Sequence, residues 1–176
     1  TMEIYAPLSE RMGMNYIRDE LEDLSFQELN PEARNLIVER LSLNKKDREK
    51  TFKEISKTFE KVLTEKNVNA KIMGREKTPF SIWRKIQSRR ISLEQLTDII
   101  GFRVIVDNIQ ACYEVLGIFH SSWSMIPGRF KDYISTPKIN NYKSLHTAII
   151  GPNKERVEIQ IRTQQMHEFA ERGIAS

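Results

Sequence analysis

The sequence predicts an α/β (α+β) fold: a helical N-terminal segment followed by a mixed β-sheet flanked by helices. Up to residue 67, apolar residues recur at steps of three and four, which is typical of helices. From residue 68 on, short runs rich in Val and Ile alternate with helical stretches. A turn signal at residues 151–154 separates two of these runs and indicates a hairpin. We therefore divide the chain into a helical extension, residues 1–67, and an α/β domain, residues 68–176.

The helical extension begins with a stretch that contains Leu21, Leu24 and Phe26. Asn30 then caps a helix whose first residue is Pro31, a position that proline favours. The later apolar residues at helical spacing are Leu36, Ile37, Leu41, Phe52, Ile55, Phe59, Val62 and Leu63. A basic run falls among them, and we interpret it as a solvated helix face because it lacks the aromatic residues and glycines of a typical nucleic-acid site. Its members are Lys45, Lys46, Arg48, Lys50, Lys53 and Lys57.

The α/β domain is expected to alternate between strands and helices along its whole length. Strands are predicted at residues 68–73, 102–106, 145–150 and 157–161. Helices are predicted at residues 79–90, 94–100, 109–123 and 164–172. The segment between residues 127 and 142 is predicted to be a long loop, and loops of this length inside a compact domain are often functional.

Composition narrows the class of protein. The 176 residues are 39% hydrophobic and carry a net charge of +4, which favours an anionic partner without separating nucleotide, nucleic acid and membrane surface. The single cysteine, Cys112, excludes an intramolecular disulfide and is expected to be a buried thiol. No run approaches the roughly 20 apolar residues that a membrane span needs, and no signal peptide is seen, so we expect a soluble, cytoplasmic protein. Both ends look cut, which suggests a piece of a longer protein.

Two carboxylates are candidates for a metal site. Glu158 alternates with Val157 and Ile159 on a predicted strand, and its ordinary interpretation is a solvent-facing side chain. Asp98, however, lies just before a neighbouring strand, followed five residues later by Arg103. Two carboxylates from neighbouring strands can hold Mg²⁺, which prefers oxygen ligands and shares its shell with substrate phosphates. The pattern by itself leaves both interpretations open.

A basic helix face is a candidate phosphate site. Lys77, Ser81 and Lys85 are four residues apart, so they share one face if the helix begins slightly before residue 79. The helix N-terminus also favours an anion. The alternative is an amphipathic helix with Ile82 and Ile86 turned inward and its basic face in water. A Walker loop is absent from the sequence, which sets aside a P-loop enzyme.

The end of the long loop suits a nucleobase and its phosphates. A tyrosine next to asparagine and lysine, as at Tyr142, could stack on a base, read its edge and touch a phosphate. The alternative is a surface connection in which Tyr142 packs against the sheet. His146 lies on the next strand, where a single histidine is usually a packing or hydrogen-bonding residue.

Four segments together resemble the synthetase domain of long RelA/SpoT-type (p)ppGpp synthetases. They are GREKTPFSIWRK, LTDIIGFRVIVD, IPGRFKDYISTPKINNYKSLHT and VEIQIRTQQMHEFAERGIA, in order and with fitting spacing over residues 70–176. Residues 1–40 are similar to the helices that join the hydrolase domain to the synthetase domain in that family. The metal-binding HD motif of the hydrolase domain is absent, so we expect no hydrolase activity in this chain.

The resemblance implies a nucleotidyltransferase-like fold and transfer of the β,γ-pyrophosphate of ATP to the 3′-hydroxyl of GDP or GTP. It makes Asp98 and Glu158 the Mg²⁺ carboxylates, with Glu158 also activating the hydroxyl. For ATP it implies that Arg75 and Arg103 sandwich the adenine. The implied phosphate ligands of ATP are Lys77, Ser81 and Lys85. For the guanine nucleotide it implies Arg129, Lys131, Lys138, Asn140, Tyr142, His146 and Gln160.

Some features bear on how far this resemblance extends. The Arg129-Phe130-Lys131-Asp132 run resembles the substrate-loop motif of bifunctional members, which accept GDP at least as well as GTP. Gly101 replaces a usual alanine, and Thr78-Pro79-Phe80 replaces a more polar run, but no catalytic group is lost. The alternatives are a nucleotide-binding or regulatory fragment without turnover, in contact with other domains or chains of a longer enzyme, and, more weakly, an RNA-binding domain.

Overall fold

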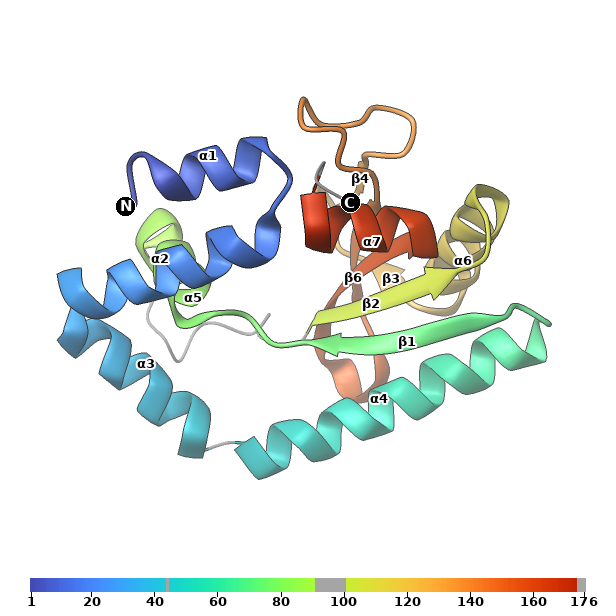
Figure 1. Ribbon diagram of the computed structural model, residues 1–176. Coiled ribbons are helices and arrows are strands. Elements are labelled where there is room, and N and C mark those ends of the chain that lie inside the picture. The colour runs from blue at the N-terminus through green and yellow to red at the C-terminus, as the bar shows by residue number, and fades with distance from the viewer. Residues whose placement is uncertain (44, 91–100, 174–176) are drawn as a thin grey trace.

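The computed structural model describes residues 1–43, 45–90 and 101–173. The helix predicted at residues 94–100, and Asp98 with it, lie outside the described residues. The first part of the chain is helical, as expected (Figure 1): α1 (Tyr5–Arg11), α2 (Asn15–Leu29), α3 (Pro31–Leu43) and α4 (Lys45–Glu65). Pro31 is the first residue of α3, which confirms the predicted helix start.

Within the described residues, a six-stranded mixed sheet forms the centre of the second part. Its strands are β1 (Ala70–Arg75), β2 (Gly101–Val106), β3 (Ser124–Met125), β4 (Lys131–Asp132), β5 (Leu145–Ile150) and β6 (Arg156–Thr163). The order is β1-β2-β6-β5-β3, and β4 also pairs with β5. Only the β2–β6 pair is parallel among these pairings. The predicted mixed sheet and the β5–β6 hairpin are thus confirmed.

The remaining helices begin where the sequence supplies a side-chain cap. Thr78 precedes α5 (Pro79–Arg89), and its hydroxyl accepts from the Ser81 amide at 3.3 Å. Asn108 caps α6 (Ile109–Ser122) in the same way. Thr163 caps α7 (Gln164–Arg172). These polar caps explain why the predicted helix boundaries agree with the structure to within one residue at each of these helices.

Two differences from the predicted elements matter for the site. β1 begins two residues later than expected and continues to Arg75, because its pairing with β2 extends to the Arg75–Gly101 partners. The predicted loop at residues 127–142 contains β4, and β3 lies just before that loop. Both strands are only two residues long and carry no β-branched residue, so the sequence offers no signal for them.

The main apolar core lies between the sheet and two helices. α4 contributes Ile55, Phe59 and Leu63, and α6 contributes Cys112 among others, all of them buried against apolar residues of β2, β5 and β6. Cys112 is therefore the buried thiol that the sequence predicts. The lysines of the basic run on α4 are exposed, as expected of a solvated face. In Figure 1, α4 runs along β1 on the side of the sheet opposite α7.

A second, smaller apolar cluster joins the helical segment to the sheet domain. Phe26 of α2 and Ile37 of α3 pack against Phe80 and Ile82 of α5. The Phe26 ring lies 5.1 Å from the Trp83 ring and 5.6 Å from the Phe80 ring, centroid to centroid. The helices before residue 45 are thus fixed to the sheet domain through α5. None of the helices in the described parts of the chain has the length and apolar character of a membrane span.

Candidate active site

One face of the sheet is polar, and the strand register shows which residues share it. Side chains that are register partners in neighbouring strands point to the same side of a sheet. Arg103 of β2 is the partner of Gln160 of β6, which in turn is the partner of His146 of β5. Lys131 of β4 is the next partner, beside His146. Four predicted site residues therefore form one row across four strands.

A second row on the same face lies two residues further along β2 and β6. Arg75 of β1 is the partner of Gly101, and Gly101 is the partner of Glu158 on β6. Gly101 has no side chain, so the space between Arg75 and Glu158 is left open on this face. α7 packs against β2 and β6 on the same side, which encloses the polar face from above (Figure 1).

The Glu158 carboxylate lies between two lysines. Its Oε2 is 2.8 Å from the Lys77 Nζ, and its Oε1 is 3.0 Å from the Lys85 Nζ. Lys77 belongs to the segment between β1 and α5, before the helix rather than on it, whereas Lys85 is on α5. Burial lowers the pKa of Lys77 from its usual value, although the negative charge of Glu158 opposes this effect. Lys77, Lys85 and Glu158 line a hollow, and Ser81 lines it as well. The Ser81 hydroxyl is 2.9 Å from that of Thr78.

Seven of the predicted residues meet in a hollow of about 170 Å³ above the first row. Tyr142 is buried there, and its hydroxyl is 2.8 Å from the Nε2 of His146. The Lys138 Nζ is 5.3 Å from the centroid of the Tyr142 ring. The predicted residues that line this hollow are Arg75, Arg103, Lys138, Asn140, Tyr142, His146 and Gln160. The two arginines expected to hold adenine thus lie beside the residues expected to hold guanine.

His146 is held neutral by its surroundings. Burial lowers its pKa to about 3, and the positive charges of Lys138, Arg75, Arg162 and Lys131 act in the same direction. At neutral pH the imidazole therefore contributes hydrogen bonds to the hollow and no charge.

Arg129 and Lys131 are not among the residues that line the hollow. Both are exposed on the segment between β3 and β5. This segment is shaped by Asp132, whose Oδ1 accepts from the amides of Ile134 and Ser135 at 2.9 Å. Asp98, the other predicted metal ligand, lies outside the described residues, so its distance from Glu158 is not part of the structure.

The N-terminal helices close one side of the hollow, a feature that sequence reasoning missed. The Asn140 Nδ2 donates to the backbone oxygen of Glu10 at 2.8 Å, and the Asn15 Nδ2 donates to that of Ala170 at 2.8 Å. Gly173, directly after α7, packs closely against the α1–α2 turn. A Cβ added to Gly173 would lie 2.6 Å from the Met12 backbone oxygen. The amide expected to read guanine is therefore bonded to α1 in this structure. Contacts between segments so far apart in the chain leave no local pattern.

Five charged residues line the hollow without having been predicted: Glu10, Arg18, Asp19, Arg162 and Glu171. Arg162 follows Glu158 and Gln160 on the polar face of β6 and is almost completely buried, at 1% exposure. Glu171 on α7 lies 3.1 Å from Arg103 and 3.3 Å from Arg162. The strict alternation of β6 was a signal that could have identified Arg162.

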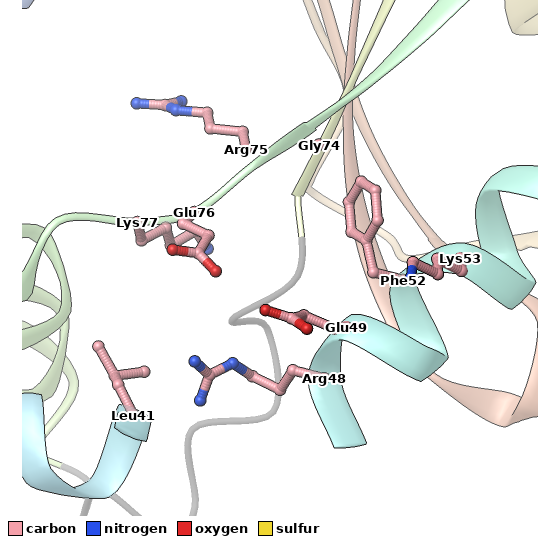
Figure 2. A pocket seen from close by; sticks show the side chains of 9 residues that line it. All are labelled: Leu41, Arg48, Glu49, Phe52, Lys53, Gly74, Arg75, Glu76 and Lys77. Carbon is pink, nitrogen blue, oxygen red and sulfur yellow. The ribbon is translucent and has the colours of Figure 1, made fainter. Parts of the chain in front are cut away.

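A separate hollow of about 290 Å³ lies between α4 and β1 (Figure 2). Phe52 is directed at Gly74 from below the strand, whereas Arg75 extends away on the other side. A Cβ on Gly74 would lie only 2.0 Å from the Phe52 ring, so this position leaves no room for a side chain. The Arg75 side chain thus belongs to the polar face, and this separate hollow borders the site at Arg75 and Lys77, which line both.

Comparison with known proteins identifies the family. A family model described as "Region found in RelA / SpoT proteins" matches residues 74–176, more than half of the chain. The chain belongs to the RelA/SpoT family. It is 51% identical over 180 residues to the GTP pyrophosphokinase rsh of Brucella melitensis and 47% identical over 176 residues to the GTP pyrophosphokinase of Myxococcus xanthus. Both alignments cover the whole chain but only 24% and 23% of those proteins, so the chain spans about a quarter of their length.

Solved structures show the same fold. Small alarmone synthetase 1 of Bacillus subtilis superposes with a TM-score of 0.58 at 23% identity, over 72% of this chain and 75% of that one. Small alarmone synthetase 2 of the same organism gives 0.55 at 30% identity, over 72% and 76%. The resemblance found in the motifs and the predicted fold class are both confirmed. The part of the family that this chain represents is its synthetase region.

The motifs of this RelA/SpoT region have distinct places in the structure. The GREK motif ends β1 and leads into α5, which directs Arg75 and Lys77 toward the polar face. The VEIQIRT motif is β6, the strand that carries Glu158, Gln160 and Arg162 on that face. The sheet therefore assembles segments that are more than 80 residues apart in sequence into one polar surface.

Proposed function

We propose that this chain transfers the β,γ-pyrophosphate of ATP to the 3′-hydroxyl of GDP or GTP, forming a (p)ppGpp alarmone. The observation that carries the proposal is the position of Glu158. Its carboxylate lies between Lys77 and Lys85, next to the row formed by Arg103, Gln160 and His146. A carboxylate so placed can accept a proton at the point where two phosphate-bearing substrates meet. Membership in the RelA/SpoT family supports this assignment.

On the donor side, we assign the ATP phosphates to Lys77, Ser81 and Lys85 and the adenine to the space between Arg75 and Arg103. Both lysines are largely buried, so their charge is less screened than at the surface. Arg75 and Arg103 are one step apart on neighbouring strands, and planar guanidinium groups stack well on a purine.

On the acceptor side, we assign the guanine to Tyr142, with Asn140 at its edge, and the acceptor phosphates to Lys138 and His146. Gln160 lies between the two sides and supports them, as the register partner of both Arg103 and His146. Arg129 and Lys131 are assigned to the same nucleotide from the exposed loop. Because the Asn140 amide is bonded to α1, guanine recognition in this way requires that contact to be exchanged.

A magnesium ion fits the donor set as far as the structure describes it. Glu158 supplies carboxylate oxygens, the ligand type that Mg²⁺ prefers, at the edge of the phosphate site. Within the described residues, no group of three His, Cys, Asp or Glu side chains gathers there. Asp98 is the proposed second carboxylate. When bound, the ion would neutralise charge on the transferred phosphates.

The chain's own residues would then perform the transfer mainly by alignment. The 3′-oxygen of the acceptor forms a bond to the β-phosphorus of ATP, and the bond from that phosphorus to the oxygen bridging to the α-phosphorus breaks. AMP leaves with that electron pair, and the hydroxyl proton passes to Glu158. Lys77 and Lys85 stabilise the charge that develops on the phosphates. Holding both nucleotides in line can supply much of the rate enhancement.

Incubation with Mg²⁺, ATP and GDP tests the proposal. We expect AMP and a guanosine tetraphosphate to appear in equal amounts, with at least a hundredfold lower rate in Glu158→Gln, in line with the roughly 10²–10⁴-fold contribution of general acid–base catalysis. Wild-type protein that makes no more product than Glu158→Gln would refute turnover. Measurable GDP affinity in that protein would then select the binding-fragment alternative.

Several further properties belong to the same proposal. We assign residues 1–67 to a helical extension and residues 68–176 to a nucleotidyltransferase-like domain, in a cytoplasmic enzyme without hydrolase activity. Since the relatives are about four times longer, contacts with further domains of a longer enzyme are proposed as well. Pyrophosphate released from added ppGpp would contradict the absence of hydrolase activity.

A further inference from the structure

Glu171 is a carboxylate shared by two arginines at the wall of the nucleotide hollow, with the His167 ring beside it. Its Oε1 lies 3.1 Å from the Arg103 Nη1, 3.3 Å from the Arg162 Nη2 and 3.9 Å from the His167 Nδ1. Arg162 also bonds to the His167 Nδ1 at 2.8 Å. Glu171 is on the last turn of α7, so it connects that helix to β2 and β6 across the hollow.

The other acidic residues of the hollow are paired elsewhere. Glu10 and Asp19 both form ion pairs with Arg18 of α2. Among the described acidic residues that line the hollow, Glu171 is thus the one that forms ion pairs with arginines of the sheet. Without it, Arg103 and Arg162 would stand side by side with their charges less compensated.

Both arginines also have one N–H donor without a hydrogen-bond partner in the described parts of the chain. Among the described residues, the Nε atoms of Arg103 and Arg162 are buried and have no hydrogen-bond partner. Buried donors of this kind are costly, and they are usually satisfied by a ligand, a water molecule or another group. The guanidinium of Arg103 is thus held at its Nη1 by Glu171, while its Nε is buried without a partner in the part of the chain that the structure describes.

We propose that Glu171 is a positioning residue that acts through Arg103, with Arg162 as the buried cation that fixes the carboxylate. It holds the Arg103 guanidinium in the orientation in which an adenine can stack on it. This inference rests on the proposed function, because it takes Arg103 as one of the two adenine-stacking arginines.

Two opposite effects are expected when the carboxylate is lost, and they can be separated. Loss of orientation weakens the binding of any ligand that stacks a base on Arg103. Loss of a negative charge favours any polyphosphate, with or without a base, by reducing repulsion. The phosphate site at Lys77 and Lys85 is a separate hollow from the one that Glu171 lines, so the orientation effect should dominate for ATP.

The experiment compares Glu171→Gln with Glu168→Gln, the same change on the same helix. The Glu168 carboxylate accepts from Gln164 at 2.7 Å and is exposed, which makes it a matched control. Calorimetry measures the Kd of the non-reactive ATP analogue AMPCPP and of inorganic tripolyphosphate for each variant. Steady-state kinetics at saturating GDP give kcat and the KM for ATP, and thermal unfolding gives Tm.

We expect Glu171→Gln to raise the Kd of AMPCPP and the KM for ATP by about tenfold, as loss of one hydrogen bond to a charged group does. The kcat should change less than about threefold, the tripolyphosphate Kd should stay equal or fall, and Glu168→Gln should match wild type. A folded Glu171→Gln that binds AMPCPP normally overturns the inference. Equal weakening of AMPCPP and tripolyphosphate, an equal effect of Glu168→Gln, or a wild type that does not bind AMPCPP overturns it as well.

A second variant covers the case in which Glu171→Gln does not fold. Glu171→Asp keeps the charge but shortens its reach by one methylene, so it should fold and still bind AMPCPP more weakly than wild type; wild-type affinity there refutes the positioning role. The failures of the two proposals are distinguishable. Wild-type protein that binds AMPCPP in a Glu171-dependent way but makes no guanosine tetraphosphate refutes the transfer reaction and leaves the positioning role standing.

Discussion

The neutral state of His146 should make the stability of the protein depend on pH in a defined direction. The pKa of His146 is about 3 in the folded protein, whereas an unfolded histidine titrates near its ordinary value of about 6.5. Because the folded-state pKa is depressed, the unfolded chain takes up the proton first as the pH falls. Stability is therefore full above about pH 6.5 and is lost as the pH falls toward 3.

The magnitude follows from the two pKa values. Between pH 7 and pH 5, proton uptake by the unfolded state alone lowers the free energy of unfolding by about 2 kcal/mol. This value hardly depends on the folded-state pKa, because pH 5 lies well above 3 and the folded histidine stays neutral. Burial is the main cause of this low pKa, and the positive charges of Lys138, Arg75, Arg162 and Lys131 add to it.

The assay is urea unfolding followed by tryptophan fluorescence at pH 7 and pH 5. His146→Gln is the control, since an amide can still reach the Tyr142 hydroxyl but does not titrate. Other titrating groups contribute equally to both proteins, so the wild type should lose about 2 kcal/mol more than the variant. Losses that agree within about 0.5 kcal/mol would refute the conclusion that His146 is held neutral.

The remaining predictions concern packing. Gly74→Ala should lower the free energy of unfolding by about 1–3 kcal/mol, because the new methyl group would collide with the Phe52 ring, which is stacked on a neighbouring phenylalanine. Gly101→Ala is its control: the nearest atom lies at 3.5 Å, so denaturant titration should show no loss or a gain of up to about 1 kcal/mol. Phe59→Ala should cost about 3–5 kcal/mol, because Phe59 contacts three other aromatic rings of the core; a cost below about 1 kcal/mol would contradict that. Burial raises the pKa of Cys112 to about 11, so a thiol reagent at pH 8 should label the unfolded protein only, and rapid labelling of the folded protein would show that the thiol is accessible.

Local signals were sufficient for most of the fold. Alternation in β6, β-branched runs in β2 and caps such as Thr78 and Asn108 each fix an element through interactions within a few residues. The hairpin could be predicted because glycine, proline and asparagine at residues 151–153 are typical of turns. β3 and β4 could not, since two-residue strands are determined by their partner β5 and not by their own sequence.

The candidate site was predictable only in part. The motif residues on β1, β2, β5 and β6 share one polar face because strand register brings them together, as family membership implied. Which of them pair in the free protein could not be read from the sequence. The contact of Glu158 with two lysines, and of Asn140 with the α1 backbone, depends on how separate elements pack. The pairing of Asp98 with Glu158 stays a prediction.

The contact of Gly173 with the α1–α2 turn has a consequence for the order in which the protein folds. It joins residues near opposite ends of the chain, and contacts of such sequence separation form late because a long loop must close first. The sheet and α7 must already be in place for this contact to form. In refolding, secondary structure should therefore appear before the hollow is closed by α1 and α2.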